Sequence, residues 1–139
     1  MMKNVFSPGW FRSFSAGLFG LSLLISSMGI QAEVNQAAAI DVLNRYLGSL
    51  ATGNVQQING LVSDTMKQSN PQLALNPDYY GEFLRTHYAG VTMQVESVLD
   101  KGEVVEARVR FDYPESESTT ITFVLGQEQG IWKITEEIF

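Results

Sequence analysis

Apolar residues recur every three or four positions along the middle of the chain, which is the spacing of a helix with one buried face. This spacing predicts a first helix along the residues from Ala37 onward, and Gly53 is its expected stop because glycine ends helices readily. A second, shorter helix is predicted next, with Asn54 as its N-cap and Gln57 in capping-box register. Its predicted buried stripe consists of Ile58, Leu61, Val62 and Met66.

A third helix is predicted after a loop that runs from residue 69 to residue 76. Asn76 is a suitable cap, Pro77 fits the first helical position, and Asp78 suits the first turn. Gly90 marks the expected end of this helix. One face of it is unusually aromatic and carries Tyr80, Phe83, Leu84, His87 and Tyr88.

After residue 90 the period changes from 3.6 to 2, which predicts strands. The first strand is predicted over residues 91–96, and a hairpin turn at residues 100–102 connects it to a second strand. A turn at residues 126–130 precedes the final strand, which ends at Phe139. The inward positions of the last three strands are Val105, Ala107, Val109, Phe111 and Tyr113, then Ile121, Phe123 and Leu125, then Trp132 and Ile134. We expect Trp132 to be buried against Phe111 or Phe123. Three helices followed by about four antiparallel strands predict an α+β domain with the helices stacked on one face of the sheet.

The first 32 residues differ from the rest of the chain. Lys3 and Arg12 are the only charges before Glu33, and residues 15–30 form an apolar stretch that ends close to Ala32. These are the three regions of a cleavable signal peptide. We therefore expect removal of residues 1–32 and one exported domain over residues 33–139, either periplasmic or secreted. A retained membrane anchor is the alternative, although a stretch of about 16 residues is short of the ~20 that a spanning helix needs.

Composition narrows the possible functions. The chain has no cysteine, which excludes disulfides, a thiol nucleophile, thiolate metal sites and lipid attachment at the cleavage site. A small secreted eukaryotic domain would usually carry disulfides, so this absence favours a bacterial periplasm. Loss of Lys3 and Arg12 with the signal peptide changes the net charge from −6 to −8. An acidic domain is repelled by phosphate backbones and anionic lipids, so we expect no nucleic-acid partner and no stable membrane insertion after cleavage.

Two segments resemble the nuclear transport factor two-like superfamily, which includes the ketosteroid isomerases and polyketide cyclases. One is the break Ala-Thr-Gly-Asn at residues 51–54, followed by a helix that leads to Asp64. The other is Gly-Ile-Trp-Lys-Ile at residues 130–134, directly after a polar hairpin. The resemblance covers essentially the whole chain after residue 32. It implies a cone-shaped, cystatin-like roll with a bent sheet around the first helix, and members that include isomerases, dehydratases, ligand binders and interaction modules.

Few residues suggest catalysis. His87 is the only histidine, so a two-histidine metal site is impossible, and we expect it to be a packing residue rather than a general base. Related isomerases polarise a carbonyl with a tyrosine and a carboxylic acid, but Asp112 falls on the outward face and no inward strand position is an aspartate. Glu136 and Glu137 are expected to be surface charges. We expect no cofactor and no metal.

Two further side chains, Arg108 and Arg110, project from one face of the second strand. They could bind an anion, but the preferred interpretation is that they form cross-strand charge pairs on a solvated face of the sheet.

A pocket, if present, is expected between the first and third helices and the inner face of the sheet. Its candidate lining residues are Tyr46, Tyr80, Phe83, Leu84 and His87 on the helices and Val109, Phe111 and Tyr113 on the sheet. The leading hypothesis is a non-enzymatic domain that binds a small apolar molecule or an envelope protein. The alternative is a cofactor-free isomerase or dehydratase, and a third possibility is a homodimer that pairs through its outer sheet face.

Overall fold

A computed structural model describes the backbone of residues 16–139 and the side chains of residues 33–139. The chain divides into two compact units, Met1–Asn35 and Gln36–Phe139. Helix α1 spans Ala16–Thr52, so its backbone passes the predicted cleavage position. The predicted signal peptide lies outside the residues whose side chains are described, and it stays a prediction. No helix in the described part of the chain has both the length and the apolar character of a membrane span.

Four short helices follow α1: α2 (Val55–Leu61), α3 (Asp64–Ser69), α4 (Gln72–Leu75) and α5 (Pro77–His87). The prediction of one helix after Asn54 is wrong, because Val62 is extended and forms a parallel bridge with Ile134. Ser63 donates its backbone N–H to the Ile134 carbonyl oxygen at 2.8 Å and caps α3 with its side chain. Pairing with a strand thus overrides the helical period. The predicted loop before α5 also contains α4.

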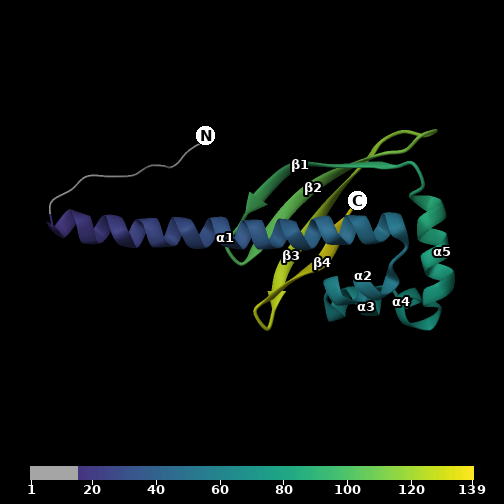
Figure 1. Cartoon of the computed structure of the whole chain (residues 1–139), viewed down its shortest axis with the longest axis horizontal. Helices are drawn as coiled ribbons and strands as arrows, with labels where there is room; N and C mark the ends of the chain where they lie inside the picture. The colour runs from purple at the N-terminus through teal and green to yellow at the C-terminus, as the bar shows by residue number, and fades with distance from the viewer. Residues whose placement is uncertain (1–15) are drawn as a thin grey trace. The chain divides into compact units, whose positions relative to one another are not determined.

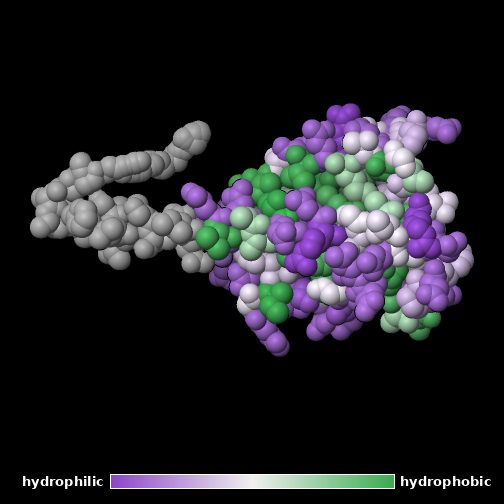
Figure 2. Space-filling model, in the orientation of Figure 1, coloured by the Kyte–Doolittle hydropathy of each residue, from purple (hydrophilic) through white to green (hydrophobic). Residues whose placement is uncertain are grey.

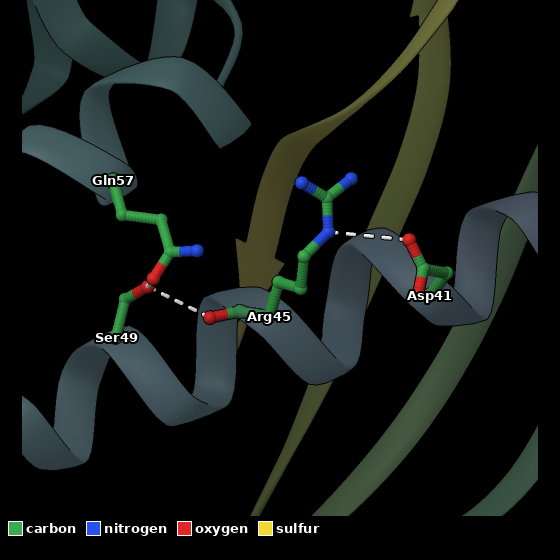
Figure 3. A network of polar contacts seen from close by, with 4 residues as sticks. All are labelled: Asp41, Arg45, Ser49 and Gln57. Carbon is green, nitrogen blue, oxygen red and sulfur yellow. Dashed lines mark hydrogen bonds and ion pairs between the residues drawn. The ribbon is translucent and has the colours of Figure 1, made fainter.

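The break between α1 and α2 has a steric cause at Gly53. Its φ is 68°, and a Cβ there would lie 2.2 Å from the Gly81 carbonyl oxygen of α5. Only glycine lets the two backbones approach so closely. Asn54 then caps α2 as predicted, accepting the Gln57 backbone N–H at 3.1 Å. The Gln57 side chain does not close a capping box, because its carbonyl oxygen instead accepts from the buried Ser49 hydroxyl, 2.6 Å away (Figure 3).

The sheet has the order β1-β2-β3-β4 and is antiparallel throughout (Figure 1). Its strands are β1 (Thr92–Asp100), β2 (Val104–Asp112), β3 (Thr119–Glu128) and β4 (Ile131–Ile138). The predicted turn at residues 126–130 is too long, because β3 continues to Glu128. Gln129 and Gly130 alone make the turn, with φ of 53° and 80°, as a tight two-residue hairpin requires.

One face of the sheet, which we call the inner face, packs with the helices into a single core. The predicted inward positions of β2 and β3 from Val105 to Phe111 and from Ile121 to Leu125 are buried, and so are Trp132 and Ile134. They form one cluster with six residues of α1, namely Ala39, Val42, Leu43, Tyr46, Leu47 and Leu50. The predicted α+β arrangement and the burial of Trp132 are therefore confirmed.

Two register shifts interrupt the pleat, and one of them shapes the site. In the β3–β4 pair, Leu125 lies opposite Ile134 while Val124 lies opposite Glu136, so Thr135 is an extra residue on β4. Such a bulge reverses which residues face the core beyond it. Glu137 therefore lies opposite Phe123 and shares its inner face. The other shift, at Glu96 of β1, brings Val98 opposite the inward Ala107.

Candidate functional site

Tyr46 and Glu137 form a polar pair on the inner face. The Tyr46 hydroxyl donates a hydrogen bond of 2.5 Å to Glu137 Oε2. Tyr46 comes from the middle of the buried stripe of α1, and its ring contacts Phe123 edge-on at 5.8 Å. Glu137 is half-buried. The β4 bulge and the helical period of α1 thus bring a phenol and a carboxylate together against the core.

Burial governs the electrostatics of this pair. It raises the pKa of the Glu137 carboxyl above its ordinary value, and the hydrogen bond from Tyr46 opposes that shift. Burial also raises the pKa of the Tyr46 phenol, and the neighbouring Glu137 charge raises it further. Tyr46 therefore keeps its proton and acts as a hydrogen-bond donor. Glu137 takes up a proton more readily than an exposed glutamate does.

Tyr80 and Tyr88 lie near the pair, and Tyr113 lies near Tyr88. Burial raises the pKa of the Tyr88 phenol. The charges of neighbouring groups raise it further, with Tyr113 contributing most, then Glu137, then Tyr80. Tyr80 and Tyr88 also affect Tyr46. Tyr80, Tyr88 and Tyr113 are each half-buried. We call Tyr46, Tyr80, Tyr88 and Glu137 together the Glu137 site.

Ring contacts connect the surface of α5 to this site. Phe83 stacks on Tyr80 at 6.1 Å and on His87 at 5.6 Å between ring centroids. His87 meets Tyr88 edge-on at 4.7 Å, and Tyr113 at 5.7 Å. The series continues inward through Phe111 and Phe123 to Tyr46. Edge-to-face and offset contacts of this kind hold aromatic side chains in fixed positions.

The structure brings most of the predicted lining residues together, but in different roles. Val109 and Phe111 are fully buried and Leu84 is 3% exposed, so these three fill the core. Phe83 is 50% exposed and His87 is also exposed, so both face solvent from α5. Tyr46 is 5% exposed and also belongs to the core, whereas Tyr80 and Tyr113 are half-buried at its edge. Tyr80 is held there by the Asn70 side-chain amide, which donates to its hydroxyl at 2.9 Å.

Two surface hollows lie elsewhere. A groove of about 650 Å³ between α2 and α5 is lined by Asn54, Gln56, Asp78, Glu82 and Arg85 among others. A smaller hollow of about 440 Å³ lies beside the β3–β4 turn and Lys133. Neither is lined by a predicted pocket residue, and the groove's charges are already partly paired, since Arg85 contacts Glu82 at 2.6 Å.

The charged face of β2 gives no anion site at Arg110. Its Nε atom donates to Asp112 Oδ1 at 2.8 Å, and Asp112 also accepts from the Ser118 hydroxyl. These hydrogen bonds, that of Ser118 first, lower the pKa of the Asp112 carboxyl. The charge pair lies within one strand, whereas a cross-strand pair was predicted.

Sequence reasoning missed Glu137. Glu136 is exposed as predicted, but the prediction that Glu137 is a surface charge is wrong. Strict alternation from Trp132 and Ile134 places residue 136, and not residue 137, on the inner face. The extra residue Thr135 shifts the alternation by one position and brings residue 137 inward. Nothing in the local sequence marks Thr135 as a bulge. Tyr88 was recognised as part of the aromatic face of α5, but its position beside Glu137 depends on the tertiary structure.

Comparison with solved structures establishes the fold class. An NTF2-like protein of unknown function from Shewanella baltica matches with a TM-score of 0.53 and 13% identity, over 75% of this chain and 90% of that one. A candidate NTF2-like transpeptidase from Campylobacter jejuni matches with a TM-score of 0.51 and 13% identity, over 69% of this chain and 95% of that one. No protein-family model and no curated protein matches the sequence. The chain therefore has the NTF2-like fold, as the resemblance implied.

Proposed function

We propose that this protein is a non-enzymatic binding protein for a small, largely apolar molecule that carries one polar group. The observation that carries the proposal is the Glu137 carboxylate, a half-buried acceptor on the inner face beside tyrosine rings. Ligand sites in proteins are mostly apolar, with a few polar groups that fix the orientation of the ligand. The rings of the Glu137 site would contact the body of the ligand, and Glu137 would accept a hydrogen bond from its polar group.

Apolar surface also lies on the first strands of the sheet. Met93, Val95 and Val98 of β1 are half-buried and pack on the edge of the core. On the face drawn in Figure 2, green apolar surface gathers over β1 and β2, with hydrophilic surface around it.

A second candidate function, a cofactor-free isomerase or dehydratase, is favoured by one observation. Such chemistry uses a tyrosine and a carboxyl group on the inner face, and Tyr46 with Glu137 places both groups there. Burial raises the pKa of Glu137, which moves it in the direction that suits a general base near neutral pH. Binding is preferred because the Tyr46 proton is already donated to Glu137, so it is not free to polarise a substrate carbonyl.

Thermal shift and native mass spectrometry would test binding. The protein purified from producing cells would be screened against small lipophilic molecules with different polar groups. We expect saturable binding of at least one, weakened by Glu137→Gln and unchanged by Glu136→Gln, since Glu136 is exposed on the same strand. If no compound binds, the proposal fails. Turnover of a bound enone or hydroxy-ketone that Glu137→Gln abolishes would instead establish the enzymatic alternative.

We also propose export of the protein to the periplasm or beyond the cell. The proposal is supported by the charge and apolar pattern of residues 1–32 and by the absence of cysteine.

A further inference from the structure

Helix α5 presents an apolar stripe to solvent. Tyr79 and Phe83 are 67% and 50% exposed, and they lie one turn apart on the same face because residues i and i+4 are neighbours on a helix. Leu75 of α4, which is 79% exposed, precedes them at the same spacing in the sequence. Figure 1 shows α5 at one end of the compact unit Gln36–Phe139, with no other element on its outer side. Exposed apolar side chains that gather in one place mark an interaction surface, whereas single scattered ones do not.

Three charged residues, Asp78, Glu82 and Arg85, run along one flank of this stripe. They are three or four positions apart, so they form a row along the helix. Arg85 contacts Glu82 at 2.6 Å, whereas Asp78 belongs to none of the ion pairs among residues 33–139. The flank is therefore acidic in the first turn of α5 and basic in the last turn.

A second copy of the same helix matches this pattern when it runs antiparallel. A two-fold axis level with residues 81 and 82 reverses the direction of the second helix and keeps the charged flanks on the same side. Asp78 of one copy then lies level with Arg85 of the other, because the two residues are equally far from the axis. Tyr79 packs near Phe83 of the second copy for the same reason. The two Glu82 side chains lie beside the axis, and each is paired with Arg85 of its own chain. The row of charges is thus complementary to itself, and the two helix dipoles are antiparallel.

From these observations we infer that α5 is a self-association surface, on which a second copy of this chain docks with its own α5 antiparallel. This surface lies apart from the Tyr46–Glu137 pair and from the outer face of the sheet. With 11 residues, α5 is about 16 Å long, so the interface is small. Small interfaces support weak, reversible complexes, and we expect a monomer–dimer equilibrium with a Kd in the micromolar range.

Analytical ultracentrifugation of the protein recovered from producing cells tests the inference. Sedimentation from about 1 µM to about 1 mM should show the monomer–dimer equilibrium. Phe83→Ser and Tyr79→Ser should each weaken the dimer at least about 10-fold, because each removes a ring from the interface. Leu99→Ser is the matched control, since Leu99 is 56% exposed but lies on β1. A protein that stays monomeric over this range would overturn the inference, and so would a dimer that folded Phe83→Ser and Tyr79→Ser leave unchanged.

Charge reversal tests the antiparallel direction. Asp78→Arg and Arg85→Asp should each weaken the dimer, because each sets like charges against one another across the axis. The double variant should restore the dimer, because it recreates the attraction with the signs exchanged. Circular dichroism would show that each variant keeps its helices. A double variant that dimerises no better than the single variants would overturn the inference.

Cross-linking locates the axis. The chain has no cysteine, so Glu82→Cys introduces a single thiol at an exposed position beside the proposed axis. A short bismaleimide should link two copies of Glu82→Cys. The same reagent should not link Glu136→Cys, whose thiol is exposed on the outer face of the sheet. Linkage of Glu136→Cys without linkage of Glu82→Cys would place the two-fold axis on the sheet and overturn the inference.

Discussion

The Tyr46 hydroxyl and the Glu137 carboxylate, 91 positions apart in the chain, are joined by a hydrogen bond of 2.5 Å. The bond connects the buried stripe of α1 to the part of β4 that follows its bulge. It brings one ionisable acid against a cluster of buried aliphatic and aromatic side chains. Most of the chemistry that can be proposed for this domain depends on that pair.

Removal of the donor should destabilise the fold. Tyr46→Phe deletes the hydroxyl and leaves the ring contact with Phe123 in place. We expect a loss of about 1–3 kcal/mol in the free energy of unfolding, because a half-buried carboxylate loses its hydrogen bond. Urea denaturation of Tyr46→Phe, Glu137→Ala and the double variant would measure the coupling, because alanine removes the acceptor. A coupling energy of zero would show that the bond contributes nothing in solution.

Stability should depend on the protonation of Glu137. Its folded pKa is raised by burial, so the folded state holds this proton more tightly than the unfolded state does. Stability from this group is therefore fully present below the unfolded pKa of about 4.3 and is lost as the pH rises through the folded pKa. We expect Glu137→Gln to become the more stable protein, relative to the wild type, as the pH increases from 4 to 8.

The same pH series has an internal check. The other titratable groups that interact with Glu137 are the phenols of Tyr46 and Tyr88, and Tyr80, Tyr113 and His87 lie beyond them. All of them are present in both proteins, so the difference between wild type and Glu137→Gln reports mainly Glu137. A difference that does not change with pH would contradict the assignment of a raised pKa.

Trp132 should be essential for stability. It is 7% exposed and belongs to the core cluster of the inner face. Trp132→Ala would leave a large cavity, and we expect a cost of roughly 3–5 kcal/mol, which is comparable to the whole stability of a small domain. Thermal and urea unfolding would measure it. A loss below about 1 kcal/mol would mean that β4 pairs in another register.

His87 should tolerate replacement by phenylalanine. It is exposed, and its ring contacts Phe83, Tyr88 and Tyr113. His87→Phe preserves the ring contacts, so we expect a change within about 0.5 kcal/mol and intact ligand binding. Binding lost with an intact circular dichroism spectrum would instead make His87 part of the site.

Export predicts a processed N-terminus. Protein recovered from producing cells should begin near Glu33, close to the start of the compact unit Gln36–Phe139. N-terminal sequencing checks this directly. Recovery of a membrane-bound species that begins at Met1 would support a retained anchor instead.

Local physics made much of the fold predictable from the sequence. The 3.6-residue period, the Gly53-Asn54 break and the Pro77 start predicted helices that the structure confirms. The two-residue period predicted the strands and their inward faces, including the burial of Trp132. These signals depend on backbone geometry and side-chain spacing within one element, so a single segment is enough to reveal them.

What only the tertiary structure decided involves contacts between elements. Val62 leaves the helical path to pair with Ile134, and Gly53 is needed because Gly81 passes so close. The Thr135 bulge turns Glu137 inward, since an extra residue shifts the phase of every later side chain. The bulge is stabilised by hydrogen bonding to β3 and by the hydrogen bond from Tyr46. Both partners lie outside β4, so the local sequence of β4 does not reveal the bulge. The sequence by itself determined where the helices and strands lie, whereas the inward position of Glu137 was decided by packing.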